Sequence, residues 1–359
     1  MDLIEEPVNY LDISHAVTGY MNTTVGPIAR IETQLQLQDF WHDGRARLSI
    51  KRNALAIAPG LFAVGNPGEL SPVLVTANYK LTFDKLRMEL TGLDLWILVI
   101  ETKGVNVWCS AGKGTFSAQE IINWVRQTSL DKVVAHRQLI LPQLAAPGVV
   151  AHSVTKFTGF KVVYGPIRAG DIRAFIANGN KANADMRRVT FNLSERIVLT
   201  PVELVLGFKF FPFIFIVFGL LNLLNNGGLA GGNLLKVAGY NSLAYWLAIV
   251  IGTVLVPIML PLLPFRSFAL KGTVAGIIWS ILVIYWGDVF QFSSHLTVML
   301  GNSLLLTALI SFLALNFTGS TPYTSFTGTQ KETLAAVPIQ IIASLAGLTL
   351  LIVSRFTGI

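Results

Sequence analysis

The sequence predicts an α/β domain followed by five membrane-spanning helices, and three observations carry this prediction. The chain of 359 residues is 52% hydrophobic and only 13% charged, which is too apolar for an ordinary soluble protein. After about Val202, long apolar runs carry almost no charge. Before that point, β-branched runs alternate with amphipathic stretches. We therefore expect two domains, residues 1–200 and residues 201–359.

Four apolar, β-branched runs predict an open, mostly parallel, Rossmann-like sheet, because such runs suit strands covered on both faces. Amphipathic stretches at 83–90, 118–127 and 168–178 predict the intervening helices, and Ser117 with Glu120 has the spacing of a capping box. Residues 35–50 have Asp43-Gly44 at their centre and predict a hairpin. We assign no role to residues 35–64. The four strand runs are VLVTANY (73–79), DLWILVIET (94–102), KVVAHRQLIL (132–141) and KVVYGPI (161–167).

Five apolar runs in the second half are each long enough to cross a hydrocarbon core as a helix. A transporter usually carries buried ionisable residues near mid-bilayer, whereas here Lys209 lies near a span end and Asp288 at an interface. We interpret the spans as an anchor, with transport as the alternative, and the polar residues of the fourth span, Asn302, Ser303, Thr307 and Ser311, as interhelical hydrogen-bonding groups. The expected spans are Leu204–Leu224, Tyr240–Leu263, Phe268–Trp286, Leu296–Phe317 and Ala335–Ser354.

The distribution of charge predicts a multi-pass protein of the cytoplasmic (inner) membrane whose first domain faces the cytoplasm. The start, MDLIEEP, shows no secretory signal, and the net charge of +7 is typical of a membrane protein's basic flanks. No zinc-finger spacing or basic helix points to nucleic acid. On the expected cytoplasmic side lie Arg187, Arg188, Arg196, Arg266, Lys271 and Lys331, against Lys236 and Arg355 on the other.

A loop rich in Gly, Ser, Thr and Pro, NFTGSTPYTSFTGTQKE (316–332), is expected between the fourth and fifth spans, on the side of the first domain. It is either a linker or a segment that docks against the first domain or a partner.

Four unusual segments are expected to converge on one edge of the sheet, because ligands of such sheets bind outside the carboxyl ends of the strands. All are small, turn-forming or polar, as expected where a flat ligand lies close to backbone. They are Thr76–Asn78, Asn106–Lys113, Leu141–Gly148 and Tyr164–Arg168.

The stretch NVWCSAGKGTFSAQE (106–120) contains the only cysteine, Cys109. A P-loop is excluded, because GxxxxGK[ST] would need glycine where Val107 stands and Ser or Thr where Gly114 stands. Three interpretations remain: an inert structural cysteine, a thiolate metal ligand favoured by the nearby Lys113, and a catalytic pair with His136 or His152. One cysteine forms no internal disulfide, which fits a reducing compartment.

NVWCSAGKGTF resembles the signature of the mercury-methylating corrinoid proteins, the HgcA family. The similarity continues through VLVTANYKLT, LPQLAAPGV, YGPIRAGDI, MRRVTFNLSERIVLTP and NFTGSTPYTS, and so covers most of the chain. Ser110 stands where alanine is expected more often. The first domain also resembles the corrinoid domain of the CO dehydrogenase/acetyl-CoA synthase corrinoid iron–sulfur protein large subunit. That relative carries a cysteine cluster for an iron–sulfur centre, which this chain lacks.

The resemblance implies a corrinoid (cobalamin-type) cofactor with Cys109 as the lower axial ligand to cobalt, carried on a short cap helix. A thiolate is a soft, strongly donating ligand, which weakens a cobalt–methyl bond trans to it. His15 is not expected to bind cobalt, because DISHAVTG (12–19) has the wrong spacing for the DxHxxG motif of other corrinoid sites. The candidate cofactor-binding residues, each with a purely structural alternative, are Thr76, Asn78, Asn106, Val107, Trp108, Cys109, Ser110, Ala111, Gly112, Lys113, Ala146, Pro147, Gly148, Tyr164, Gly165 and Arg168.

By this resemblance the chain is a corrinoid-dependent methyltransferase that moves a methyl group from cobalt to Hg(II), yielding methylmercury. The implied partners are a ferredoxin-like protein with two four-iron clusters (HgcB-type), as electron donor and Hg(II) carrier, and a methyl-donating methyltransferase or methyl-folate. Two alternatives stay open: a membrane-anchored corrinoid methyl carrier of one-carbon metabolism, and a corrinoid-binding membrane sensor or transporter.

Overall fold

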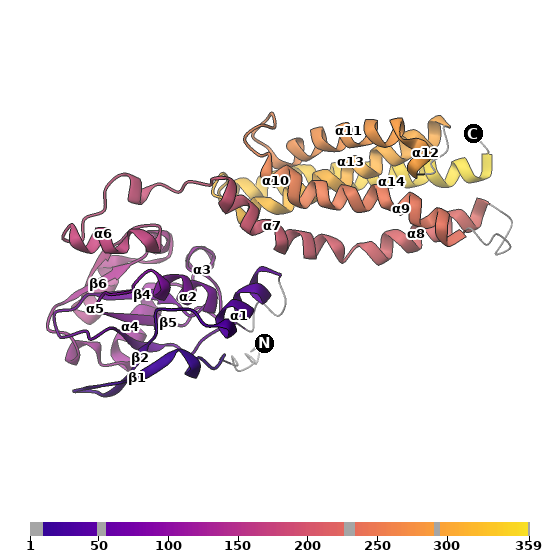
Figure 1. Ribbon diagram of the computed structural model, residues 1–359. Helices are drawn as coiled ribbons and strands as arrows, with labels where there is room; N and C mark the ends of the chain where they lie inside the picture. Colours follow the sequence, from indigo (N-terminus) through magenta and orange to yellow (C-terminus); the bar gives the residue numbers. More distant parts are fainter. Residues whose placement is uncertain (1–9, 49–54, 226–233, 291–294, 358–359) are drawn as a thin grey trace, which may run out of the picture. The chain divides into compact units, whose positions relative to one another are not determined.

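The computed structural model describes residues 10–48, 55–225, 234–290 and 295–357, and it divides into two compact units, Met1–Val189 and Thr190–Ile359 (Figure 1). The first unit is α/β and the second is helical. The domain boundary expected after residue 200 falls inside helix α7 (Leu193–Phe208).

Within its described residues, the first unit is built on a seven-stranded mixed sheet with the order β1-β2-β3-β5-β4-β6-β7. Strands β5, β4, β6 and β7 are mutually parallel, as predicted, whereas β1 pairs with β2, and β3 with β5, in antiparallel fashion. The third predicted run is a strand only over its last four residues. The strands are β1 (Val17–Thr23), β2 (Gly26–Ile31), β3 (Gly60–Val64), β4 (Val73–Ala77), β5 (Leu95–Ile100), β6 (Gln138–Leu141) and β7 (Lys161–Tyr164).

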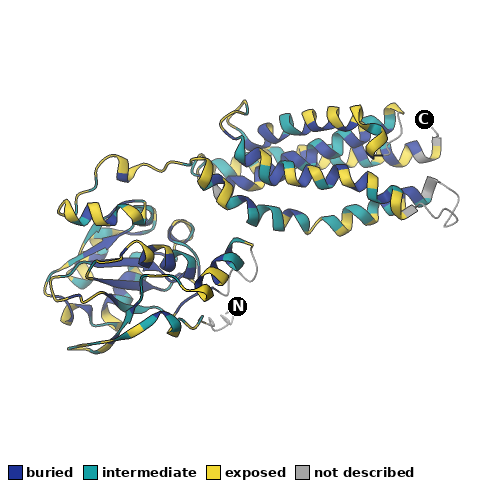
Figure 2. Cartoon of the chain, in the orientation of Figure 1, coloured by how far each residue is buried: buried dark blue, intermediate teal, exposed yellow. Residues whose placement is uncertain are grey.

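Helices bury both faces of the central strands, which explains their unbroken apolar runs. Val75 and Leu98 pack in one core with Ile121, whereas Leu74 and Ile97 pack in the other with Phe83. All residues of β4 and β5 are buried, and Figure 2 shows these strands in dark blue. The helices are α1 (Leu37–Arg47), α2 (Lys80–Met88), α3 (Val107–Lys113), α4 (Ala118–Gln127), α5 (Ala151–Thr158) and α6 (Ile172–Ala177).

The hairpin predicted at 35–50 is wrong: its described part is helix α1, and Ser49 and Ile50 lie outside the described residues. Gln36 and Asp39 form a capping box that starts the helix. Gly44 lies within the helix, where a glycine costs only about 1 kcal/mol. The hairpin of this unit is instead β1–β2, which the sequence reasoning missed.

Helix α1 is held against α2 by a cluster of buried charges. The Lys80 ammonium lies 2.6 Å from Asp39 Oδ1 and also contacts Asp84, while Arg87 pairs with Asp39 at 2.7 Å and with Asp84 at 2.8 Å. The side chains of these four residues are at most 1% exposed. Burial alone would raise the pKa of Asp39, but hydrogen bonds from Lys80 and His15 outweigh it and hold that pKa below its usual range. His15 is thus engaged with Asp39, which fits its expected exclusion as a cobalt ligand.

Replacing Lys80 should therefore destabilise the first unit strongly. We expect Lys80→Met to cost about 3 kcal/mol or more, because it leaves two buried carboxylates facing one arginine. Hydrogen exchange of the β5 amides in the full-length chain measures this loss. The exposed Lys85 of the same helix provides the control, since Lys85→Met should change stability by less than about 0.5 kcal/mol. Equal effects of the two substitutions would contradict the role of the cluster.

Asp43 makes the stability of α1 depend on pH in the opposite direction to Asp39. Burial, and secondarily the nearby Asp84, raise the pKa of Asp43 from 3.8 to about 6. The folded state therefore binds this proton more tightly than the unfolded state, and stability falls as pH rises from about 4 to about 6. We expect Asp43→Asn to stabilise α1 at pH 7 by about 1 kcal/mol, with no gain below pH 4. Hydrogen exchange of the α1 amides across this pH range measures the stabilisation. A stabilisation by Asp43→Asn that did not change with pH would contradict the raised pKa of Asp43.

The second unit contains five helical segments long and apolar enough to cross a membrane, which confirms the predicted number among the described residues. These segments are Leu193–Leu223, Leu235–Ile258, Phe268–Tyr285, Leu296–Gly319 and Thr327–Ser354. Lys209 lies between the two helices of the first segment and not near its end. The remaining helices are α8 (Phe211–Asn225), α9 (Leu234–Val250), the π-helical turn Ile251–Leu255, α10 (Val256–Ile258), α11 (Phe268–Tyr285), α12 (Gly287–Phe290), α13 (Leu296–Asn316) and α14 (Phe326–Thr357).

The loop expected at 316–332 is mostly helical, so that expectation is wrong. Helix α13 runs to Asn316, a 3₁₀ turn follows at Phe317–Ser320, and α14 begins at Phe326. The side chain of Ser325 accepts the Gly328 amide at 3.1 Å, which is the helix-capping use of a serine. A serine that suggested a loop in the sequence therefore caps the start of α14.

Candidate functional site

The four segments predicted to converge do leave the same edge of the sheet. Because β4, β5, β6 and β7 run parallel, their carboxyl ends at Ala77, Ile100, Leu141 and Tyr164 lie along one edge. The candidate cofactor-binding residues that are not in a strand lie in the segments that follow these four strands. Helix α3, which carries Cys109, is in the segment that follows β5.

Asn78 organises this edge from inside the protein. Its Nδ2 donates to the Ile57 carbonyl at 3.2 Å and to Glu101 Oε1 at 2.8 Å. Its Oδ1 accepts the Thr102 hydroxyl at 2.8 Å and the Thr102 and Gly104 amides at 3.1 Å. Asn78 is fully buried, so the structure gives its amide a positioning role in the turn between β5 and α3. Thr76 is also buried, at 2% exposed, and contact of either side chain with a ligand stays a prediction.

The predicted cap helix is present as α3, and its ends are set by its own sequence. Asn106 Oδ1 accepts the backbone N–H of Cys109 at 2.9 Å, which is an N-cap. The Ser110 hydroxyl, where alanine was expected, donates to the Asn106 carbonyl at 2.6 Å and adds a bond to the first turn. Gly114 ends the helix in the left-handed conformation at φ 79°.

Cys109 lies on the partly exposed side of α3, which separates it from an ordinary core cysteine. Val107, Ser110 and Ala111 face inward, whereas Trp108 is 39% exposed and Lys113 is exposed. Added Cβ atoms at Gly112 and Gly114 would meet nothing within 4 Å, so the surface beside the helix is free of side-chain bulk there.

His136 does not form a catalytic pair with Cys109. Its Nε2 lies 2.8 Å from the Ser71 carbonyl, and its Nδ1 accepts the Gln138 amide at 3.2 Å. It precedes β6 and thus lies at the amino-terminal edge of the strands, whereas Cys109 follows the carboxyl end of β5. His152 lies in the first turn of α5.

The segment after β6 packs directly against α3. A Cβ on Gly148 would lie 2.5 Å from the Phe116 carbonyl oxygen and 2.8 Å from the Ala111 Cα, a distance that real atoms do not adopt. Ala146 is half-buried and Pro147 is exposed in the same 3₁₀ turn, Gln143–Gly148. Glycine at position 148 is therefore what lets this turn support the cysteine helix.

The residues after β7 close the edge. The Tyr164 hydroxyl donates to the Val149 carbonyl at 3.1 Å, and burial raises the pKa of Tyr164. The buried Gly165 amide donates to the Leu141 carbonyl at 2.8 Å, and a Cβ there would lie 3.0 Å from Ile140 Cγ2. Arg168 is exposed just before the turn Ala169–Asp171. Tyr164 and Gly165 thus hold backbone segments together, and direct ligand contact by these residues stays a prediction.

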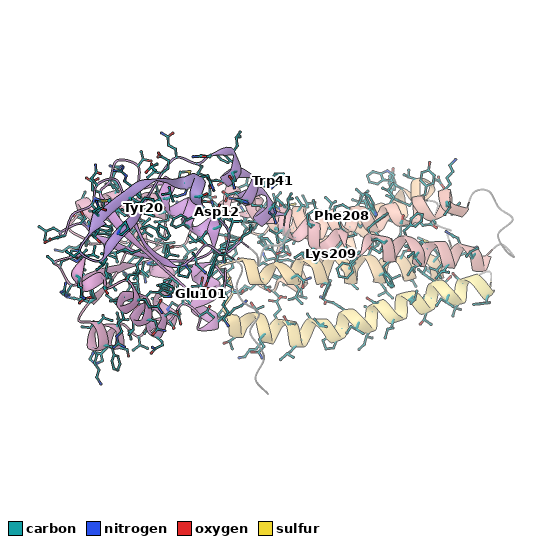
Figure 3. All side chains as sticks on the ribbon, turned by 90° about the horizontal axis from the view of Figure 1, so that it is seen from below. Asp12, Tyr20, Trp41, Glu101, Phe208 and Lys209 are labelled. Atoms are coloured by element: carbon teal, nitrogen blue, oxygen red, sulfur yellow. The ribbon has the colours of Figure 1, made fainter. Side chains whose placement is uncertain are left out.

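Glu101 is the site residue that the sequence reasoning missed. Its Oε1 accepts from Asn78, and its Oε2 accepts the Tyr10 hydroxyl at 2.6 Å. Burial and this hydrogen bond raise the pKa of Tyr10 to about 12. Glu101, labelled in Figure 3, is the first acidic residue after a fully apolar strand at the ligand edge, and that position was the available signal.

Comparison with known proteins finds relatives of part of the α/β unit. Residues 50–176, which include β3 to β7 and Cys109, match the family described as CO dehydrogenase/acetyl-CoA synthase delta subunit. The acetyl-CoA decarbonylase/synthase complex subunit gamma of Archaeoglobus fulgidus is 34% identical over 127 residues, 35% of this chain and 27% of the relative. The same subunit of Methanopyrus kandleri is 32% identical over 155 residues, 43% of this chain and 32% of the relative.

A third relative, the corrinoid/iron-sulfur protein large subunit of Moorella thermoacetica, is 32% identical over 122 residues, 33% of this chain and 27% of the relative. The chain thus spans about a quarter to a third of the length of these curated relatives. The α/β unit is related to these subunits, which supports the predicted likeness to a corrinoid domain. The finer likeness to mercury-methylating proteins stays a prediction.

The contact at Gly148 predicts how firmly Cys109 is placed. We expect Gly148→Ala to displace α3 at a cost of about 1–3 kcal/mol and to speed the reaction of the Cys109 thiol with N-ethylmaleimide severalfold. The measured rate reports on Cys109 alone, because the sequence has one cysteine. Gly112→Ala is the matched control, since its Cβ meets open space and alanine favours a helix. Identical rates in the two variants would show that Gly148 does not position the thiol.

Proposed function

We propose that the α/β unit binds a corrinoid at the carboxyl edge of its sheet, with Cys109 as the axial ligand to cobalt, and transfers a methyl group from it to Hg(II). The single observation that carries the proposal is a partly exposed cysteine on a capped helix at the ligand edge of a domain related to corrinoid-protein subunits.

The residues present fit such a cofactor. Within the described parts of the chain, no group of three or more His, Cys, Asp or Glu side chains is placed to hold a metal ion. A metal that arrives in its own macrocycle needs only one further protein ligand, and Cys109 offers a soft sulfur donor. The open surface at Gly112 and Gly114 suits the approach of a flat ring to backbone.

The protein's contribution is orientation of the sulfur and control of access to it. When bound, a corrinoid would supply a cobalt-bound methyl group as the donor for transfer to Hg(II). Asn106 fixes the first turn of α3, and Gly148 fixes its underside, so the Cys109 thiolate can donate its electron pair from a set position.

The single cysteine also determines what partners must do. With Cys109 donating to cobalt, this sequence has no second thiol to bind Hg(II) or an iron–sulfur centre. We therefore propose that a ferredoxin-like protein with two four-iron clusters delivers electrons and Hg(II), and that a methyltransferase or methyl-folate supplies the methyl group. The five apolar segments would hold the reaction at the cytoplasmic face of the membrane.

A second candidate function is a corrinoid methyl carrier of one-carbon metabolism. It is favoured by the names of the relatives, which are subunits of acetyl-CoA decarbonylase/synthase complexes. It shares the cofactor with the first proposal and differs in the methyl acceptor.

The deciding experiment is an anaerobic methylmercury assay on the corrinoid-loaded full chain with a ferredoxin-like reductant and a Hg(II)–thiolate complex. We expect methylmercury from the wild type, and from Cys109→Ala the loss of both the product and the thiolate-ligated cobalt absorption spectrum. Cys109→His separates ligation from folding, because imidazole should restore an axial ligand with a different spectrum. A thiolate-type spectrum without methylmercury from the wild type would overturn the mercury assignment and leave the carrier; an unchanged spectrum in Cys109→Ala would overturn ligation by Cys109.

A further inference from the structure

Helix α1 buries its polar face and exposes its apolar face, the reverse of an ordinary helix on a soluble domain. Asp39, His42 and Asp43 are buried against α2. On the opposite side, Leu37 is 88%, Phe40 59% and Trp41 68% exposed. The buried charge cluster that includes Asp39 fixes this orientation, because turning the helix over would leave Lys80 and Arg87 without that partner.

The exposed apolar residues form one continuous stripe. Leu37, Trp41, Gly44 and Leu48 follow one another at helical spacing, and Phe40 lies one turn before Gly44. Leu48 is 41% exposed. Arg45 and Arg47, both partly exposed, lie on either side of the stripe in the last turn. An apolar stripe of Leu, Phe and Trp bordered by arginines is typical of a helix that lies in a membrane interface.

We propose that α1 lies in the headgroup region of an anionic bilayer, with Leu37, Phe40, Trp41 and Leu48 in the lipid and Arg45 and Arg47 at the phosphates. The same chain carries five segments long and apolar enough to cross a membrane, and this points to a bilayer as the occupant of the exposed face of α1. Tryptophan favours the interface because its ring is apolar and its N–H is polar. Each arginine near an anionic surface adds attraction that neutral lipid lacks. This inference does not depend on the methyl acceptor.

Docking through α1 would fix the orientation of the α/β unit against the bilayer. Asp39 joins α1 to Lys80, the first residue of α2, and α2 begins three residues after β4 ends at the ligand edge. The helix is thus tied by buried ion pairs to the strand end that carries the candidate site, and a partner approaching along the membrane would meet that edge in one orientation.

Photocrosslinking of the full chain in lipid nanodiscs tests the proposal. We would place p-benzoylphenylalanine at Trp41 or at Tyr20, both labelled in Figure 3 and both 68% exposed, in discs of equal parts phosphatidylglycerol and phosphatidylethanolamine. After irradiation, mass spectrometry distinguishes phospholipid adducts from links to polypeptide. We expect phospholipid adducts at position 41 in severalfold excess over position 20.

Arg45→Gln with Arg47→Gln should lower the lipid adduct at position 41 severalfold, to the yield seen in discs of phosphatidylcholine alone. The arginines lie outside the Cys109 site, so corrinoid loading should be unchanged. Links from position 41 only to polypeptide, whether to this chain or to another protein, would overturn the proposal in favour of a protein contact. Equal, low yields at positions 41 and 20 would overturn it in favour of a solvated face, and an unchanged yield in the double variant would remove the arginines' role.

Discussion

The candidate site depends on the side chain of one buried asparagine. Asn78 bridges the end of β4, the residues after β5 and the segment at Ile57, using both ends of its amide. Each such bond contributes about 1 kcal/mol, and a buried partner left unpaired costs about 1–3 kcal/mol. A side-chain amide can donate to two acceptors and accept from several donors at one point. An aliphatic side chain at position 78 would leave the polar groups of the turn that leads into α3 without a hydrogen-bond partner.

From that turn, the position of the sulfur follows through short-range constraints. Helix α3 has seven residues, too few for stability by itself, so its place is imposed by what it contacts. Asn106 caps it, Gly114 stops it, and Gly148 admits the backbone of the neighbouring turn against Ala111. These contacts fix the backbone of the short helix that carries Cys109 at the edge of the sheet. A rigid support of this kind suits the proposed role of Cys109 as a ligand to a metal.

Features encoded locally could be predicted from the sequence. The strands β4 and β5 follow from unbroken apolar runs, and the start of α4 follows from Ser117, whose hydroxyl accepts the Glu120 amide. Helix α3 was expected only from the family resemblance, and the structure shows that Asn106 caps it and Gly114 ends it. Helix α1 could not be predicted in this way. Its buried residues are Asp39, His42 and Asp43, and what makes their burial favourable is Lys80 and Arg87, about forty residues further along the chain. Glu101 was missed for the same reason, since its partners Tyr10 and Asn78 are distant in sequence.

Several polar side chains of the second unit hydrogen-bond across its helices, which favours the anchor over the transport path. Tyr245 donates to Asn302 Oδ1 at 2.8 Å, and Ser311 donates to the Ala269 carbonyl at 2.9 Å while accepting from Gln340. Lys271 donates to the Leu263 carbonyl at 2.9 Å, near the start of α11. Glycines bring the helices close, as where Gly276 faces Thr307. Polar side chains that already bond across helices serve cohesion, and a conducting path would have to break those bonds to use them. In the function proposed above, the chemistry would belong to the α/β unit, and the five apolar segments would serve as its anchor.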